Sequence, residues 1–289
     1  MPELPEVETI ARSLRNAAAL AFKPKQSLNE RPGVIGRKVN NAEVTWARSI
    51  AVPDAATFIS RVCGQTILDV QRRGKFLVFQ MNFDWLLIHL RMSGDIRVEL
   101  QEALTIQRHD RVTFNFEDGS RMVLNDTRKF GRVWLVEDKE TILGELGPEP
   151  LSEKLTREVF FTRLQQHKTG IKSLLLDQHF IAGMGNIYTD EALYLAGIHP
   201  LQKAMSLTPE RAGRLLEAIR SVLYEGIRRN GVSIDWVYRG GDFQNCLKVY
   251  QRTGEACLVC GSKIERITVG QRGTHYCPCC QSLQTDRCH

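Results

Sequence analysis

Four cysteines near the C-terminal end constrain this chain more than any other feature. Cys257 and Cys260 form one pair with two residues between them, and Cys277 and Cys280 form a second such pair. A two-residue gap lets both sulfurs of a tight turn face one ion, and two such pairs supply the four thiolates of a tetrahedral site. The spacing predicts a zinc-binding hairpin. Because four cysteines leave no open position on the metal, we expect one structural zinc ion.

The other cysteines leave some room around this prediction. Seven of the eight cysteines fall within residues 246–289, so they are not a disulfide framework for the whole chain. Cys279 would break the two-residue spacing if it replaced a neighbour, and Cys288 and His289 stay open as alternative ligands. Cys63 lies far from the cluster and is interpreted as a small buried side chain.

The size of the chain favours two domains with a third small unit, because 289 residues exceed one small module. Hydrophobic residues make up 43% of the chain, which is enough for a buried core. Apolar runs such as 17–22 and 192–198 are far shorter than the ~20 residues that span a bilayer. The acidic N-terminus lacks the apolar core of a signal peptide. We therefore expect a cytoplasmic protein with no membrane partner.

The charge of the chain is mildly basic, with 39 Lys and Arg against 33 Asp and Glu and a net charge of +6. Residues 246–289 contain six basic and three acidic side chains, so this segment carries half of the excess. Such a balance permits a polyanionic partner without requiring one. Any such partner should contact the cysteine-rich end.

The first part of the chain, residues 1–148, is predicted to be a helix followed by a β-sandwich. Pro2 to Leu20 has a proline and three glutamates in its first turns, which is typical of a helix start. Many short strands with turn signals follow, and this pattern favours a sandwich. The predicted strands cover 66–81, 85–92, 95–100, 111–116, 121–124 and 132–136.

The Gly-Pro-Glu-Pro segment at 147–150 breaks this pattern and marks the domain boundary. Residues 149–245 then show helical periodicity, and residues 246–289 form the cysteine-rich finger. We expect helices over 156–167, 171–178 and 187–196, a long helix opening at Thr208-Pro209, and a loop over 231–245. The fold class is therefore a multidomain α+β protein.

The N-terminus has the chemistry of a nucleophile. Pro2 follows the initiator Met, and removal of that Met would expose a secondary amine whose pKa of roughly 8 leaves a useful unprotonated fraction. Such an amine forms a cationic iminium with a sugar aldehyde carbon, which promotes elimination. Glu3 beside it could act as general acid and base. Without further motifs, a helix-start proline and a carboxylate that complements the helix dipole are the better explanation, because helices often open this way.

A series of motifs runs along the chain. It opens with Met-Pro-Glu-Leu-Pro-Glu-Val-Glu-Thr at residues 1–9 and ends with the four-cysteine finger. Between them lie the segments 72–75, 89–94, 125–131, 147–150, 171–172, 183–188, 196–200 and 271–272. Together these motifs closely resemble the bacterial formamidopyrimidine-DNA glycosylases, which are grouped with the endonuclease-VIII enzymes, and the likeness runs nearly end to end and in order.

This resemblance implies a base-excision repair enzyme that removes oxidised purines, chiefly 8-oxoguanine and formamidopyrimidines, and then nicks the abasic strand by β,δ-elimination. It also implies a helix on a β-sandwich, then a helix–two-turns–helix domain with a zinc-ribbon finger. The expected partner is damaged double-stranded DNA. We expect a monomer without a small-molecule cofactor, associated with the bacterial nucleoid through DNA.

The resemblance also assigns catalytic roles to individual residues. Pro2 would be the Schiff-base nucleophile, and Glu3 would move a proton toward the sugar ring oxygen. Lys75 would bind the phosphate beside the lesion and assist acid catalysis. Glu6 matches another acidic position of the signature with a supporting role.

The expected DNA contacts fall into two groups. Flipping a base costs a few kcal/mol and leaves a hole in the stack. Met92 and Phe130 match the apolar residues that fill this hole, and Arg128 matches the residue that hydrogen-bonds the orphaned base. By the same resemblance, phosphate contacts are expected from His89, Lys172, Asn186 and Arg272.

One segment departs from the family pattern. Residues 231–250 are several residues shorter than the lesion-capping loop of the family, which leaves the ranking of lesions open. The aromatic and basic side chains of this loop suit stacking on the damaged base, and a packed surface loop is the alternative. These side chains are Trp236, Tyr238, Arg239 and Phe243. Ser93, directly after Met92, is another residue that could tune the pocket.

Three alternatives remain at this level. An endonuclease-VIII-like enzyme would prefer oxidised pyrimidines, but Leu4-Pro5 and the segment with Arg128 favour the purine branch. A non-catalytic DNA-binding protein would not need an intact Pro2, Glu3 and Lys75. A zinc-ribbon transcription or RNA-processing protein would not explain the N-terminal motif.

Overall fold

The computed structural model describes residues 1–15, 33–101, 106–233 and 240–283. The chain divides into two compact units. The first contains the described residues of Met1–Glu145 and of Asn230–Gly241, and the second contains Leu146–Arg229 and the described residues from Asp242 onward. The segment around residue 231 thus belongs with the N-terminal residues, although the sequence places it in the helical region. The division into domains 1–148, 149–245 and 246–289 stays a prediction.

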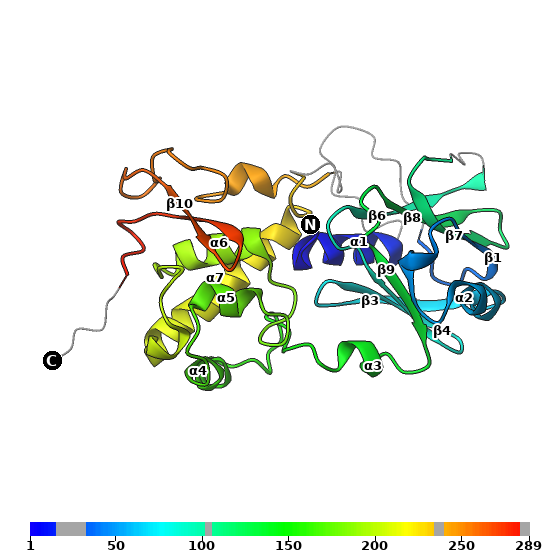
Figure 1. The fold of residues 1–289 in the computed structure, drawn as a ribbon, viewed down its shortest axis with the longest axis horizontal. Helices are drawn as coiled ribbons and strands as arrows, with labels where there is room; N and C mark the ends of the chain where they lie inside the picture. The colour runs from blue at the N-terminus through cyan, green and yellow to red at the C-terminus, as the bar shows by residue number, and fades with distance from the viewer. Residues whose placement is uncertain (16–32, 102–105, 234–239, 284–289) are drawn as a thin grey trace. The chain divides into compact units, whose positions relative to one another are not determined.

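The first unit contains two β-sheets that share one apolar core (Figure 1). One sheet has the order β1-β7-β8-β6, and the other has the order β2-β9-β5-β4-β3. All neighbouring strands are antiparallel except β2 and β9. The strands are β1 Val39–Val44, β2 Ile50–Val52, β3 Ile67–Arg73, β4 Phe76–Met81, β5 Trp85–His89, β6 Gly94–Glu99, β7 Asp110–Phe116, β8 Arg121–Asp126 and β9 Arg132–Val136.

The helices of the first unit complete this core. Helix α1 (Leu4–Arg15) packs against β3 and β4, and its buried face carries Val7, Ile10 and Leu14. Helix α2 (Ala55–Val62) contacts β1 and β2, and α3 (Glu140–Leu143) follows β9. The short 3-10 helix η2 (Ala47–Ser49) lies between β1 and β2. The predicted helix and β-sandwich are therefore confirmed.

The sequence missed some local detail in this unit. The segment 66–81, predicted as one strand, is the hairpin of β3 and β4, because Gly74 adopts a left-handed φ of 55° and reverses the chain. Strands β1 and β2 and helix α2 were not predicted at all. The predicted end of the first helix, after Arg15, lies outside the described residues.

The second unit begins with a set of helices. They are α4 (Arg157–Gln165), α5 (Ile171–Leu176), α6 (Asn186–Leu195) and α7 (Pro209–Arg228), with 3-10 turns η4 (Ala204–Ser206) and η5 (Phe243–Cys246). Thr156 and Thr208 cap α4 and α7 by accepting a backbone N–H, and both helices begin where the sequence predicts them. Helices α5 and α6, joined by glycine-containing turns, form the predicted helix–two-turns–helix element.

The finger closes the second unit as a two-stranded hairpin of β10 (Glu265–Val269) and β11 (Arg272–Tyr276). Its tight turn is Gly270-Gln271, and both residues have a positive φ, 53° and 62°. This is the conformation that suits the right-handed twist of a two-residue hairpin. In Figure 1 the hairpin lies beside α6, with which β11 is in contact. Among the described residues, no helix is long and apolar enough to cross a membrane.

Candidate active site

The start of α1 holds the two residues expected to act on the sugar. Pro2 and Glu3 are buried, and the helix begins at Leu4. Glu6 reaches back and accepts the backbone N–H of Glu3 at 2.8 Å, which is half of a capping box. Position 3 is therefore held by a bond from within its own helix.

Two ion and hydrogen-bond contacts fix the direction of α1 along β3. The guanidinium of Arg15 donates to the carbonyl of Val70 at 2.7 Å. About two turns closer to the N-terminus, Glu8 accepts from Arg72 at 3.0 Å. Because this order runs toward the β3–β4 turn, the start of α1 lies at the end of the sheet where Gly74 reverses the chain.

Lys75 follows this turn directly and is buried, with 6% of its surface exposed. Strand pairing places the other expected contacts at the same sheet end. Phe76 pairs with His89, and His89 pairs with Arg132 on β9. The chain leaves β5 for Met92 just past His89, and it reaches Arg132 from the turn of Arg128 and Phe130. The helix and strands that carry the predicted site residues thus terminate at the same end of the sheet. These residues are 2–3, 75, 92 and 128–130.

His89 is neutral in this setting. Its side chain is buried, and burial, followed by the nearby charges of Arg91 and Lys75, lowers the pKa of the imidazole to about 3. Its Nδ1 atom accepts the backbone N–H of Arg91 at 3.0 Å, and its ring meets that of Phe76 edge-on at 4.8 Å. Any phosphate contact of His89 would therefore be made by a neutral N–H rather than by a cation.

The segment 231–233 is tied to the same helix. Glu6 accepts the backbone N–H of Val232 at 2.8 Å through the oxygen that does not bind Glu3. Gly231 has a φ of +80°, and a Cβ there would lie 2.5 Å from this carboxylate. Ser233 and Gly241 exchange two hydrogen bonds, at 2.9 and 3.0 Å. Positions 231–233 and 241 of the predicted lesion loop are thus fixed within the first unit, whereas the loop from Asp242 onward belongs to the second.

The predicted lesion-loop residues differ in what can be said of them. Trp236, Tyr238 and Arg239 lie outside the described residues. Phe243 is buried and stacks on Tyr188 with a ring distance of 5.1 Å. This geometry favours a packing role for Phe243 in the second unit.

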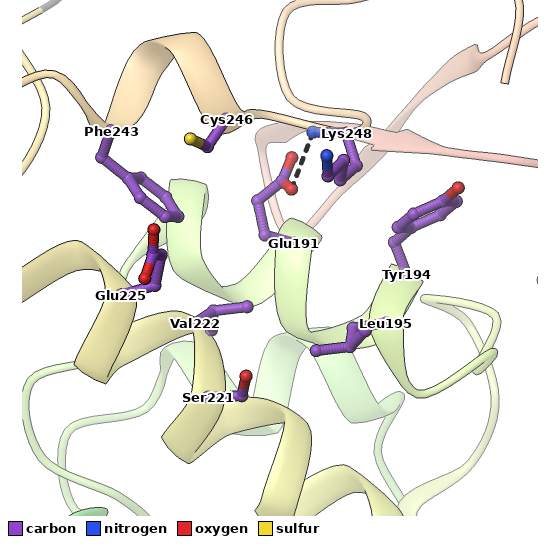
Figure 2. Close-up of a pocket in the computed structure, with 9 residues that line it drawn as sticks. All are labelled: Glu191, Tyr194, Leu195, Ser221, Val222, Glu225, Phe243, Cys246 and Lys248. Atoms are coloured by element: carbon purple, nitrogen blue, oxygen red, sulfur yellow. Dashed lines mark hydrogen bonds between the residues drawn. The ribbon is translucent and has the colours of Figure 1, made fainter. Parts of the chain in front are cut away.

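Phe243 also lines a pocket of about 250 Å³ beside α6 and α7 (Figure 2). Glu191 of α6 lies at this pocket and accepts backbone N–H groups from Lys248, Val249 and Tyr250, each at 2.9 Å. These bonds fasten the segment that leads into the finger. None of the predicted catalytic side chains lines this pocket.

The four cysteines of the finger come together as the spacing predicts. Their sulfurs all lie within 4.8 Å of one another, and the Cys257–Cys280 and Cys260–Cys277 pairs are 3.8 and 3.4 Å apart. A tetrahedral zinc ion with bonds of about 2.3 Å separates its sulfurs by slightly less than ~4 Å. Backbone N–H groups also point at the sulfurs of Cys257 and Cys277 at 3.4 Å. The donor set fits one structural zinc ion.

Helix α6 supports this metal site from one side. The hydroxyl of Tyr194 lies 3.2 Å from the sulfur of Cys257. Burial, followed by the bond to Cys257, raises the pKa of Tyr194, so the hydroxyl stays protonated and can donate to a thiolate. Gln281 donates to the carbonyl of Ile198 at 2.9 Å and accepts from Cys277.

The predicted phosphate contacts of the second unit meet at the turn of the finger. Asn186 donates to the carbonyl of Gly273 at 2.9 Å, and Lys172 donates to the same carbonyl at 3.2 Å. Arg272, the exposed neighbour of Gly273, opens β11. Lys172 is fully buried and pairs with Asp190 at 2.6 Å. For Lys172 this geometry favours a structural role beneath Arg272 rather than a direct contact with a phosphate.

Several residues that support the site were not predicted from the sequence. Asp126, Arg132, Asp190, Glu191 and Tyr194 hold loops or the finger in place through buried or partly buried bonds. Asp126 lies within the family-like motif 125–131, but the motif alone predicts no role for its carboxylate. An apolar surrounding of Asp190 and Glu191 on a helix face was the signal that could have marked them as buried acids.

Comparison with known proteins decides the family. Three family models match successive parts of the chain: the formamidopyrimidine-DNA glycosylase N-terminal domain over residues 24–133, the H2TH domain of that enzyme over 146–237, and a zinc finger found in FPG and IleRS over 254–283. A formamidopyrimidine-DNA glycosylase of Brevibacillus brevis is 43% identical over 98% of this chain and 100% of its own length. The chain belongs to the formamidopyrimidine-DNA glycosylase family.

Solved structures of this family agree with the fold. A Lactococcus lactis FPG mutant in complex with Fapy-dG-containing DNA is 35% identical, with a TM-score of 0.85 over 97% of this chain and all of that one. The wild-type Lactococcus lactis enzyme in complex with DNA containing an oxidised pyrimidine has a TM-score of 0.84 with the same identity and coverage. Enzymes of this family are DNA glycosylases with abasic-site lyase activity, and the fold and the four-cysteine cluster of this chain conform to that family.

Proposed function

We propose that this chain excises oxidised purines from duplex DNA and then cleaves the strand at the abasic site. The observation that carries this proposal is the convergence at one sheet end of the N-terminal residues, Lys75 and the two turns with Met92 and Phe130. Family membership supports the same activity, because similar enzymes have been seen with damaged DNA.

The chemistry begins at Pro2 once Met1 is removed. The amine nitrogen bonds to C1′ of the damaged nucleotide, and the bond from C1′ to the base breaks as the base leaves with a proton. Glu3 then protonates the ring oxygen, which opens the sugar and leaves an iminium. This cation draws electrons from the C2′–H bond, so a base removes that proton and the 3′ phosphate departs. A second elimination releases the 5′ phosphate.

The remaining residues would bind DNA. Lys75 would neutralise the phosphate beside the lesion, and Met92, Arg128 and Phe130 would occupy the hole left by the flipped base. Arg272 would contact a phosphate from the finger, with Asn186 holding the turn beneath it. His89 would contact a phosphate as a neutral donor. Trp236, Tyr238 and Arg239 would cap the lesion. We propose a cytoplasmic monomer that acts on the nucleoid.

The single zinc ion supplies no reactive position when bound, because four cysteine sulfurs complete its coordination. Its role is to hold the finger hairpin, and thereby Arg272, in one conformation. None of the catalytic steps uses it.

Borohydride trapping tests the proposal directly. Borohydride reduces an iminium to a stable amine, so protein with Met1 removed should become covalently linked to a duplex that contains 8-oxoguanine opposite cytosine. A matched preparation that retains Met1, verified by mass spectrometry, should give no adduct. If the zinc-loaded, Met1-free protein forms none either, the proposed enzymatic activity is wrong.

The same assay on oxidised pyrimidines decides between the two branches of the family. Faster trapping on oxidised pyrimidines than on 8-oxoguanine would favour the endonuclease-VIII-like alternative.

A further inference from the structure

Two turns of the sandwich present apolar side chains to solvent. Met92, in the turn between β5 and β6, is 41% exposed, and Phe130, in the turn between β8 and β9, is 49% exposed. The two turns touch, because a guanidinium nitrogen of Arg128 lies 3.7 Å from the sulfur of Met92. Solvent-exposed turns with such side chains need something beneath them to hold a single arrangement.

Asp126 lies beneath both turns and is 1% exposed. One carboxylate oxygen accepts the hydroxyl of Ser93, the residue after Met92, and also the backbone N–H of Arg128 at 3.1 Å. The other oxygen accepts the backbone N–H of Gly131 at 2.7 Å. One side chain therefore bonds to the turn of Met92 and to two points of the turn of Arg128 and Phe130.

Other contacts complete this arrangement around Asp126. The hydroxyl of Ser93 accepts the N–H of Arg128 at 3.2 Å, which joins the turns a second time. A Cβ at Gly131 would lie 3.2 Å from the carboxylate, so the turn closes tightly on it. On the opposite side of the turn, Arg132 donates to the carbonyls of Gly131 and Lys129 at 2.9 and 3.3 Å.

The turn is also fastened at its outer edge. Lys129 has a left-handed φ of 62°, and its ammonium lies 4.1 Å from the centre of the Trp46 ring. This cation–π contact offsets the cost of a conformation that side chains rarely adopt. The backbone on both sides of Phe130 is thus held by side chains outside the turn.

We propose that Asp126 is a positioning residue that, together with Ser93, locks the turns of Met92 and of Arg128 and Phe130 into one rigid body before DNA binds. The proposal rests on the void-filling role given to these turns above. Turns that are already ordered lose little conformational entropy when their side chains enter the base stack. The free-energy cost of ordering them therefore does not oppose base flipping. Because the hydroxyl of Ser93 donates to Asp126, that proton is not available to the lesion.

Asp126→Asn tests this role, since the amide keeps the shape of the carboxylate but replaces one acceptor oxygen with a donor. That donor would face an N–H or a hydroxyl of the turns. We expect single-turnover excision of 8-oxoguanine from duplex DNA to slow by about 10- to 100-fold. Borohydride trapping on a single-stranded abasic oligonucleotide, which has no opposite base and no hole to fill, should stay within about 2-fold of the unmodified protein.

Asp84→Asn is the matched control. Asp84 is also a buried carboxylate of the sandwich, 5% exposed and bonded to Arg61 and Gln65, but it lies at the turn before β5, at the other end of that strand. This variant should be destabilised without a selective loss on duplex DNA. Ser93→Ala removes both bonds of the Ser93 hydroxyl but leaves the carboxylate with its bonds to Arg128 and Gly131, so it should show the same selectivity as Asp126→Asn with a smaller effect. It keeps the test decisive if Asp126→Asn fails to fold.

The outcomes separate the two proposals. If the unmodified protein traps neither substrate, the proposed function is wrong. If it traps both and the Asp126 and Ser93 variants match it on the duplex, the positioning role is wrong. Equal slowing on duplex and single strand, or the same selectivity from Asp84→Asn, would reduce Asp126 to a general structural residue and also overturn the proposal.

Discussion

The sandwich and the finger both present a tight turn, but they hold it in different ways. The turns of Met92 and Phe130 stand on a core shared by two sheets and two helices. The apolar cluster of the finger consists of Tyr194, Val249, Cys257, Ile264 and Cys277, and two of these five residues are predicted metal ligands. The large buried core should keep the sandwich folded when one contact is lost, whereas the finger buries little apolar area that could stabilise it.

The finger compensates with directional bonds. Asp190 and Glu191, adjacent on α6, accept from His275 and from the segment 248–250, and Lys172 bridges Asp190 to Gly273. Buried bonds of this kind are strong as a set but costly to break singly, because the remaining partner is left without compensation. We therefore expect the finger to respond to single substitutions more sharply than the sandwich.

The largest effect is expected from loss of a metal ligand. Cys277→Ala should abolish zinc binding, and because zinc binding supplies on the order of 10 kcal/mol in small finger peptides, the hairpin should lose its structure. Zinc content by atomic absorption measures the loss of the metal, and DNA affinity by titration should fall because Arg272 is no longer held in place to contact a phosphate.

Cys279→Ala is the control, since Cys279 is exposed and stands between two ligands without belonging to the cluster. It should bind one zinc ion and DNA normally. A loss of zinc in both variants, or in neither, would contradict the assigned ligand set.

A smaller effect is expected from the buried pair of Lys172 and Asp190. Lys172→Met leaves a buried carboxylate without its cation, which costs about 3–5 kcal/mol of the free energy of unfolding. Urea denaturation measures this cost, and faster zinc release to a chelator would show that the loss reaches the finger. Lys203→Met removes an exposed lysine of the same unit and should change little.

Combining Lys172→Met with Asp190→Asn sharpens this test. The double variant should cost less than the sum of the two single variants, because the unpaired charge is gone. If the costs simply add, the ion pair does not carry the coupling that the geometry implies.

The fold of the chain followed from its sequence where the pattern was regular. Thr156 located the start of α4, Thr208-Pro209 and the apolar face after it located α7, and the cysteine spacing located the finger. The hairpin of β3 and β4 escaped because one glycine, Gly74, reverses a run that reads as continuous strand. Strand β2 and helix α2 are short, and they depend on packing against β9 and β1 rather than on local preference.

The candidate site was predictable in its residues but not in its connections. Motif identity named Pro2, Glu3 and Lys75, whose roles on DNA stay predictions, and spacing named the finger cysteines, which the structure brings together. Sequence could not show that Lys172 is buried in an ion pair, because an isolated lysine is ordinarily a surface residue. It also could not show that the bond between Glu6 and Val232 joins positions 226 residues apart.

An intermediate effect should appear in the sandwich as a pH dependence. The imidazole of His89 is neutral in the folded protein down to about pH 3, since its pKa is lowered to about 3, whereas the unfolded chain takes up a proton below about pH 6.5. Stability is therefore lost as the pH falls from about 6.5 toward 3, by about 2 kcal/mol between pH 7 and pH 5.

His89→Gln should remove this part of the slope, as measured by urea denaturation at both pH values. His179→Gln, at an exposed position of the second unit, should leave it in place. If the His89 variant and the unmodified protein show the same difference between pH 7 and pH 5, the imidazole is not held neutral.

The smallest effect concerns two glycines with nearly the same backbone conformation. Gly231 in the first unit has a φ of +80°, and Gly254 in the finger has a φ of +82°. A Cβ at Gly254 meets nothing within 4 Å, whereas one at Gly231 meets the Glu6 carboxylate at 2.5 Å. Replacement by alanine should cost about 1 kcal/mol at Gly254 from backbone strain alone.

Gly231→Ala should cost about 1 kcal/mol more, because Glu6 must move and its bonds to Glu3 and Val232 weaken. The difference between the two variants in urea denaturation isolates this contact, since the backbone strain cancels. Because Glu6 is displaced in the Gly231→Ala protein, that variant should also excise the damaged base more slowly. The Gly254→Ala protein should excise it at the unmodified rate. Equal stability and equal rates would show that the sandwich absorbs the added methyl group, and the tie between the catalytic helix and the lesion loop would then have no energetic weight.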